Sequence, residues 1–439
     1  MVSQNGAESN LPVAELENSL SAFLQPMLAC LPEKRLRAVA QLAVQGIIGG
    51  QSPMVTRIAL GSRRAEETTW PVAKRLYRFV ENKRFSARDL LKGLYGIAQQ
   101  VVATYAPAYV VIALDPVNLE KPYTRRLEGV CTVMKSTPPG PRGEKRLTFG
   151  YPAMTATVVN LPVPVVTYAS WFSYVSADFV SERREIYRAI RISRALLPAA
   201  VLRFVGDAGL DDQKLFAQVE VARGQFIFRV CHDRQVEVYN DRLDCWEPEM
   251  LADLMATVPW ALTFRVTFTH AGRARHDDVS LGYLRLRLPD THQELWCVVA
   301  HTPMFNRDIG LLTNIPITND HEARTAYCDW RFRAQIEHTY RFDQEDGLDV
   351  EDLRVRTLER MRRIFVLVLA AALFVSHIAH TWPQPWVLWL RHLGGKLGLA
   401  ADRDGLYILL AGIRAVFVTA ATLAFAAKHP FPRAAGTYG

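Results

Sequence analysis

Apolar positions in residues 1–105 recur every three or four residues, a spacing that predicts helices. The pattern is clearest over residues 16–31 and 36–48, and a glycine pair marks the expected end of the second helix. Residues 57–94 then interleave cations with aromatic rings, which suits phosphate contacts and docking into a nucleic-acid groove. A solvated amphipathic bundle explains the same pattern. We interpret residues 1–105 as a helical DNA-binding region.

From residue 106 the pattern changes to short apolar runs typical of buried strands. One run, 109–114, ends at Asp115, and another, 200–205, ends at Asp207, so two predicted strands each carry a carboxylate to their carboxyl end. The alternation of these strands with helices predicts a mixed α/β fold. The other expected strands span residues 147–159, 163–174 and 225–231, and the expected helices span 181–197 and 210–223.

Residues 234–306 predict a β-rich insertion subdomain, because three segments alternate or run apolar as strands do and the stretch is too long for a structureless loop. The α/β domain is therefore expected to comprise residues 106–233 and 307–380, with a helical C-terminal region over 381–439. The strand-like segments of the insertion are 260–269, 281–288 and 293–300. After it, a short apolar segment over 311–315 and helices over 330–344 and 353–377 are expected.

Composition changes this picture only modestly. The 439 residues are 49% hydrophobic and 22% charged, which is ordinary for a globular chain. The formal net charge of +8 weakly favours an anionic partner. Six scattered cysteines form no CxxC pair, which argues against zinc ribbons and disulfide frameworks and favours a cytoplasmic location. The polar N-terminus has no signal-peptide pattern.

Two apolar stretches raise the question of a membrane. Residues 364–375 are too few to span a bilayer, and residues 406–427 are long enough but contain Arg414, which is costly inside a membrane. We therefore expect no stable membrane association. A membrane-associated protein is the alternative that residues 406–427 leave open.

The predicted helix over 330–344 carries a third acid, Glu337. With 3.6 residues per turn, Trp330, Arg333, Glu337 and Gln344 fall within an arc of roughly 60°. Taken alone, this face is better explained by a solvated Arg–Glu pair. Together with the two strand-end acids it predicts a three-carboxylate site. Such a site can hold two Mg²⁺ or Mn²⁺ ions for phosphoryl transfer, whereas zinc is less expected because no His or Cys lies at ligand spacing.

These residues resemble the catalytic signature of bacterial insertion-sequence transposases of the DDE type. The spacing of the four residues on the helix is similar to the Y-(2)-R-(3)-E-(6)-K signature of one group, although this chain has Trp330 in place of Tyr and Gln344 in place of Lys. The segments around Asp115 and around Asp207 resemble the blocks that carry the other two acids. The resemblance extends over residues 75–377.

The resemblance implies an RNase-H-like mixed sheet flanked by helices, interrupted by a β-rich insertion. It implies a transposase that cleaves transposon ends with divalent metal ions and transfers the 3′-hydroxyl strands into target DNA, as a homodimer on paired ends near the nucleoid. Asp115, Asp207 and Glu337 would be the metal ligands. Arg333, Trp330 and Gln344 would contact DNA, with core packing the alternative for Trp330. A non-catalytic DNA-binding relic of a transposase is the alternative function.

Overall fold

The computed structural model describes residues 11–62, 68–135, 146–270, 273–303, 308–334, 347–395 and 406–428. Contacts divide the chain into two compact units. Unit 1 comprises Met1–Ile97, Leu119–Gly150 and Thr339–Gly439, and unit 2 comprises Ala98–Asn118 and Tyr151–His338. These two units do not correspond to the predicted domains. The predicted divisions therefore stay predictions: 1–105, 106–233 with 307–380, 234–306 and 381–439.

Unit 1 is mainly helical. Its regular elements are α1 (Val13–Ala29), α2 (Lys34–Gly50), α3 (Val55–Gly61), α4 (Thr69–Glu81), the first half of α5 (Ala87–Tyr105), β2 (Cys131–Met134), η3 (Val350–Asp352), α11 (Leu358–Thr381), α12 (Gln384–Leu393) and α13 (Leu406–Lys428). Helix α2 ends at Gly50, the second residue of the glycine pair expected to stop it, and the left-handed residue after the helix is Gln51.

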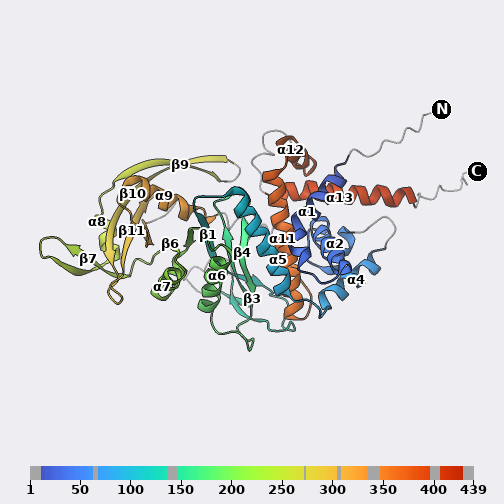
Figure 1. Ribbon diagram of the computed structural model, residues 1–439, viewed down its shortest axis with the longest axis horizontal. Coiled ribbons are helices and arrows are strands. Elements are labelled where there is room, and N and C mark those ends of the chain that lie inside the picture. Colours follow the sequence, from blue (N-terminus) through green and yellow to red (C-terminus); the bar gives the residue numbers. More distant parts are fainter. Residues whose placement is uncertain are drawn as a thin grey trace, which may run out of the picture. The chain divides into compact units, whose positions relative to one another are not determined.

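Helix α11 forms the centre of unit 1, where it packs against α1, α2 and α4 (Figure 1). It is buried on nearly all sides over its apolar run, and the ring of Phe374 lies 5.7 Å from that of Phe23 in α1. In its second turn the buried Arg363 donates to the carbonyl oxygens of Val80, Asn82 and Phe85, at 2.9, 2.6 and 2.7 Å. Arg363 therefore satisfies backbone acceptors at the end of α4 and in the connection between α4 and α5.

Two helices of the described residues, α11 and α13, are long and apolar enough to cross a membrane by length and composition. Burial within unit 1 explains the apolar character of α11, because 78% of its most apolar window is buried. The buried share of the corresponding window in α13 is 39%. Arg414 in α13 donates to the carbonyl oxygen of Gly49 and to the side chain of Gln51, both at 3.1 Å. The expected lack of stable membrane association stays a prediction.

Lys121 joins two segments of unit 1 that are distant in sequence. Its ammonium group is buried and donates to the carbonyl oxygens of Val350, at 3.3 Å, and Glu351. Burial lowers the pKa of Lys121 to about 8, although the carboxylates of Glu351 and Asp349 act in the opposite direction. The fold therefore disfavours the charged form of this side chain.

A stability profile should reveal this buried lysine. The unfolded chain keeps the Lys121 proton up to its ordinary pKa of 10.5, whereas the folded chain releases it near pH 8. The unfolded state then binds more protons, so the free energy of unfolding should rise between pH 8 and 10, by about 2–3 kcal/mol. Urea unfolding at several pH values measures this rise. The K121M variant should lack it, and an equal rise in that variant would contradict the assignment.

Unit 2 contains most strands of one large sheet, together with the helices that pack on it. Its elements, including β1 and β3, which continue into unit 1, are β1 (Val110–Glu120), β3 (Leu147–Val158), β4 (Val165–Trp171), α6 (Glu182–Leu196), β5 (Leu202–Gly206), η1 (Ala208–Leu210), α7 (Gln213–Val221), β6 (Gln225–Arg229), β7 (Gln235–Asn240), β8 (Cys245–Met250), α8 (Leu251–Thr257), β9 (Leu262–His270), β10 (Arg273–Arg287), β11 (Glu294–His301), β12 (Ile309–Thr313) and α9 (Asp320–Arg331). The expected mixed α/β class is confirmed, and most strand pairs are antiparallel.

The sheet runs in the order β2-β3-β1-β5-β6-β12-β11-β10-β7-β8, with β4 beside β3 and β9 beside β10. Only β1 with β5 and β5 with β6 are parallel among the pairs whose register is known. The strands of the predicted insertion extend this same sheet through β12, so the structure shows no separate β layer for them. The RNase-H-like character of the fold stays a prediction.

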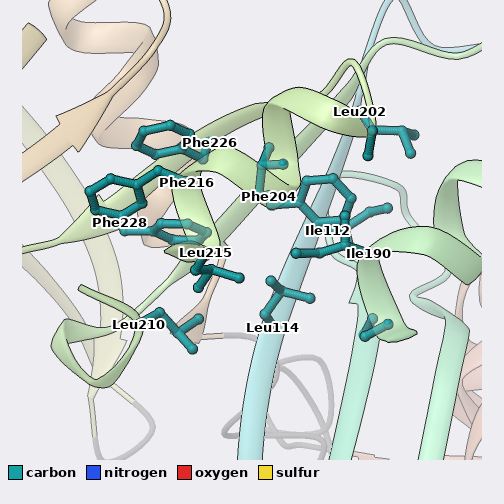
Figure 2. Close-up of a cluster of buried hydrophobic side chains, with 14 of the residues drawn as sticks. Ile112, Leu114, Ile190, Leu202, Phe204, Leu210, Leu215, Phe216, Phe226 and Phe228 are labelled. Atoms are coloured by element: carbon teal, nitrogen blue, oxygen red, sulfur yellow. The ribbon is translucent and has the colours of Figure 1, made fainter. Parts of the chain in front are cut away.

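The core of unit 2 lies against the parallel strands. Figure 2 shows Ile112 and Leu114 of β1 beside Phe204 of β5, with the rings of three further phenylalanines next to them. Those rings, of Phe216, Phe226 and Phe228, are stacked, with centroids 4.7 to 6.0 Å apart. Helix α6 lies beside β4 and α7 beside β6 (Figure 1). Burial of these aromatic and aliphatic side chains stabilises the parallel strands.

Candidate functional site

Asp115 and Asp207 occupy equivalent positions on neighbouring parallel strands. The register pairs Val110 with Leu202 and continues to Ala113 with Val205. Extending it by two residues places Asp115 beside Asp207, with the strands about 4.8 Å apart. Because residues in register on parallel strands face the same side of a sheet, both carboxylates lie on one face. The observed pairing ends at Ala113 with Val205, so the proximity of the two predicted acids is an extension of this register.

Asp115 does not lie at the tip of its strand, so the predicted placement is wrong. Strand β1 continues to Glu120, beyond the segment that pairs with β5. Antiparallel contacts with β3 support the extension: the amide of Val159 donates to Val111, and the amide of Lys121 donates to Phe149. The apolar run ended at Asp115 because the second half of the strand is less buried, and the strand itself did not end there. Asp207 does follow the last residue of β5 directly, as predicted.

A third side chain at this edge is Arg229, which the sequence analysis did not select. The register of β5 with β6 pairs Gly206 with Phe228, so Arg229 lies beside Asp207. Its Nη1 is 3.5 Å from Oδ1 of Asp207. The sequence carries one signal for this residue. Arg229 is a cation at the carboxyl end of a mainly apolar strand, and the neighbouring strand β5 is followed by the acid Asp207.

Helix α9 brings Trp330 against the end of β5. The indole Nε1 donates to the carbonyl oxygen of Gly206 at 3.1 Å, and the side chain is only 5% exposed. Of the two roles considered for Trp330, core packing is the one that this geometry shows. Its hydrogen bond holds the backbone directly before Asp207, so Trp330 positions that acid.

Arg333 also approaches Asp207. Its Nη2 is 4.0 Å from Oδ2 of Asp207, and its guanidinium lies 5.9 Å from the centroid of the Trp330 ring. Asp207 is half-exposed, with 46% of its side chain accessible, while Arg333 is 16% accessible. A solvent-facing carboxylate with a cation on each side is available to an incoming ligand.

The continuous helix predicted over residues 330–344 is wrong at its beginning. Helix α9 ends at Arg331, and the amides of Phe332 and Arg333 donate to carbonyl oxygens three residues back, which tightens the last turn. Trp330 and Arg333 therefore do not share a regular helical face. Glu337 and Gln344 lie outside the described residues.

Two buried ion pairs hold the segments that flank Asp207. Arg203 of β5 pairs with Asp329 of α9, to which the hydroxyl of Tyr109 also donates at 3.3 Å. Burial raises the pKa of Asp329, while Arg203 lowers it. The second pair joins Asp211 to Arg234, and Asp211 also accepts from the amide of Cys231 at 3.0 Å. Asp211 is thus engaged in holding the loop after β6.

Within the part of the chain that the structure describes, no group of three His, Cys, Asp or Glu side chains is close enough to hold a metal ion. Asp115 and Asp207 supply two carboxylates, and carboxylate oxygens are the ligands that Mg²⁺ and Mn²⁺ prefer. These two residues fit such an ion chemically, and a third ligand must come from elsewhere.

Comparison with known proteins gives a distant similarity among solved structures. No protein-family model matches the chain, and no curated protein matches it. Among solved structures, the chain resembles the piggyBac transposase in its synaptic complex with hairpin DNA, with a TM-score of 0.41 and 6% sequence identity. That alignment covers 96% of this chain and 83% of the other.

Proposed function

We propose that the chain is a DNA transposase that binds the ends of its element, cleaves them with divalent metal ions and transfers the 3′-hydroxyl strands into target DNA. The observation that carries the proposal is the pair of acids, Asp115 and Asp207, which the register of β1 with β5 aligns on neighbouring parallel strands, with Asp207 directly after the last residue of β5. Ligand sites of open α/β sheets lie at such carboxyl ends. The signature spacing of Trp330, Arg333, Glu337 and Gln344 supports the same assignment.

Asp115, Asp207 and Glu337 would hold two Mg²⁺ or Mn²⁺ ions, which activate the attacking oxygen and stabilise the leaving oxygen when bound. The chain itself contributes a rigid edge, because Trp330 fixes the backbone before Asp207. Arg333 and Arg229 lie beside Asp207, where guanidinium groups suit bidentate contacts with a phosphate. Gln344 would donate a neutral hydrogen bond to DNA.

The proposal includes an RNase-H-like catalytic fold, double-stranded DNA as substrate and a homodimer on paired ends, in the cytoplasm near the nucleoid. The sequence has 52 lysine and arginine residues against 44 aspartate and glutamate residues, and this net charge of +8 suits a polyanionic partner.

The DNA on either side of the gene provides the test. The purified chain should cleave a duplex carrying the flanking inverted repeats when Mg²⁺ or Mn²⁺ is present, and it should not cleave after chelation by EDTA. A duplex with scrambled repeats is the control. Tight repeat binding without cleavage in either metal would instead identify a non-catalytic relic, and neither binding nor cleavage would reject the proposal.

A further inference from the structure

Two segments of unit 1 line a single cavity. Residues 121–127 follow β1, and residues 351–356 precede α11, so they are more than two hundred positions apart in sequence. The cavity between them has a volume of about 760 Å³, within the range of pockets that enclose small organic ligands. The carboxylate site described above lies on different residues.

The fold holds this cavity open with its own polar contacts. Lys121 is buried and bonded to the carbonyl oxygens of Val350 and Glu351, and the carboxylate of Glu351 accepts from the amide of Glu120 at 2.8 Å. Asp352 pairs with Arg354 at 2.8 Å. The acidic side chains that line the cavity are therefore already engaged.

Two arginines of the lining, Arg126 and Arg356, differ from these groups. Both are exposed, and within the described ranges neither guanidinium has an ion-pair partner. They come from the two separate segments, so the fold places uncompensated positive charge on both sides of the cavity. Guanidinium groups arranged in this way suit a phosphate.

The lining also includes an aromatic side chain that the core does not use. Tyr123 is 100% exposed, which is unusual for a residue of its size. An exposed ring beside arginines offers a surface for base stacking, the interaction by which proteins bind unpaired strands. A phosphate contact and a stacking surface together match a nucleotide unit.

We propose that this cavity binds one nucleotide of an unpaired DNA strand, with Arg126 and Arg356 contacting the phosphate and Tyr123 stacking on the base. The proposal rests on the proposed function in that the ligand is DNA. Bases of an intact duplex are stacked on one another, so they cannot occupy a Tyr123 platform. The site should therefore prefer a single strand to a duplex of the same length.

Binding of a short fluorescein-labelled oligothymidylate to the full chain tests the proposal, with fluorescence anisotropy as the measurement. The Y123A variant should weaken binding about tenfold. The Y123F variant should bind like wild type, because a phenylalanine ring stacks on a base as a tyrosine ring does. The R126Q/R356Q double variant should weaken binding about tenfold and, because one phosphate contact is lost, make the salt dependence shallower by about 0.7 in log–log slope. Arg242, an exposed arginine after β7, gives the matched control R242Q, which should bind normally.

The outcomes separate this proposal from the proposed function. Wild-type affinity in both Y123A and R126Q/R356Q would overturn the nucleotide site, even if the chain cleaves its repeats. Equal weakening of oligothymidylate and duplex by Y123A would also overturn it, since stacking would then not distinguish the two. Weakened oligothymidylate binding in these variants would support the site even in a chain that cleaves nothing.

Discussion

Replacing Asp207 by Asn should reduce metal-dependent cleavage of the terminal repeats by at least about a thousandfold. The amide keeps the shape of the side chain but removes the charge that would bind the metal ion, and a loss of about 4 kcal/mol in transition-state stabilisation corresponds to that factor. D115N should behave in the same way, because Asp115 occupies the equivalent position on the neighbouring strand. Initial cleavage rates at saturating Mg²⁺ measure both effects.

Folding and DNA binding should survive these changes. Asp207 is 46% exposed, and its contacts with Arg229 and Arg333 are at 3.5 and 4.0 Å, so its ion pairs contribute little to stability. The matched control is D278N, which removes another exposed, arginine-paired carboxylate. Cleavage by D207N within a few fold of wild type, with D278N also active, would refute the metal-ligand role of Asp207.

Replacing Arg203 by Met should destabilise the fold by about 3–5 kcal/mol, because it leaves Asp329 buried without its cation. The loss should depend on pH. Burial raises the pKa of Asp329 and Arg203 lowers it, so removing Arg203 raises that pKa further. A folded pKa above the unfolded value means that stability falls as pH rises through the folded pKa. The deficit of R203M should therefore be largest at neutral pH and shrink in acid.

Urea unfolding of wild type and R203M across this pH range measures the deficit directly. The exposed pair Arg265–Asp278, with side chains 67% and 58% accessible, supplies the control R265M. That variant should lose little stability at any pH, because solvent screens an exposed pair. A deficit of R203M that matched R265M, or that did not change with pH, would contradict the assigned role of Arg203.

The sequence predicted the strands and helices around the site well, because burial there produces long apolar runs. Ser181 begins α6 as a helix cap that accepts from the amide of Arg184, and the predicted helix 181–197 is confirmed within a residue at each end. The end of β5 at Asp207 is confirmed for the same reason. Strand register, which brings Asp115 next to Asp207, depends on pairing between distant segments and could not be inferred from either strand alone.

The error at α9 has a local cause. A capping box at residues 319–322 starts that helix: the Asn319 side chain accepts from the amide of Glu322, and the Glu322 carboxylate accepts from the amide of Thr318. Recognising it would have begun the helix at Asp320. The hydrophobic pattern then continued through Trp330 without a breaker, so the tight turn at Arg333 had no signal in composition.

The assembly of unit 1 has a consequence for synthesis on the ribosome. Helices α1, α2 and α4 leave the ribosome early, but their central partner, α11, is translated only after all of unit 2 up to His338. At ordinary elongation rates that delay lasts on the order of tens of seconds. During this interval the apolar faces of the N-terminal helices are uncovered, so this part of the nascent chain should depend on chaperones until residue 381 has emerged.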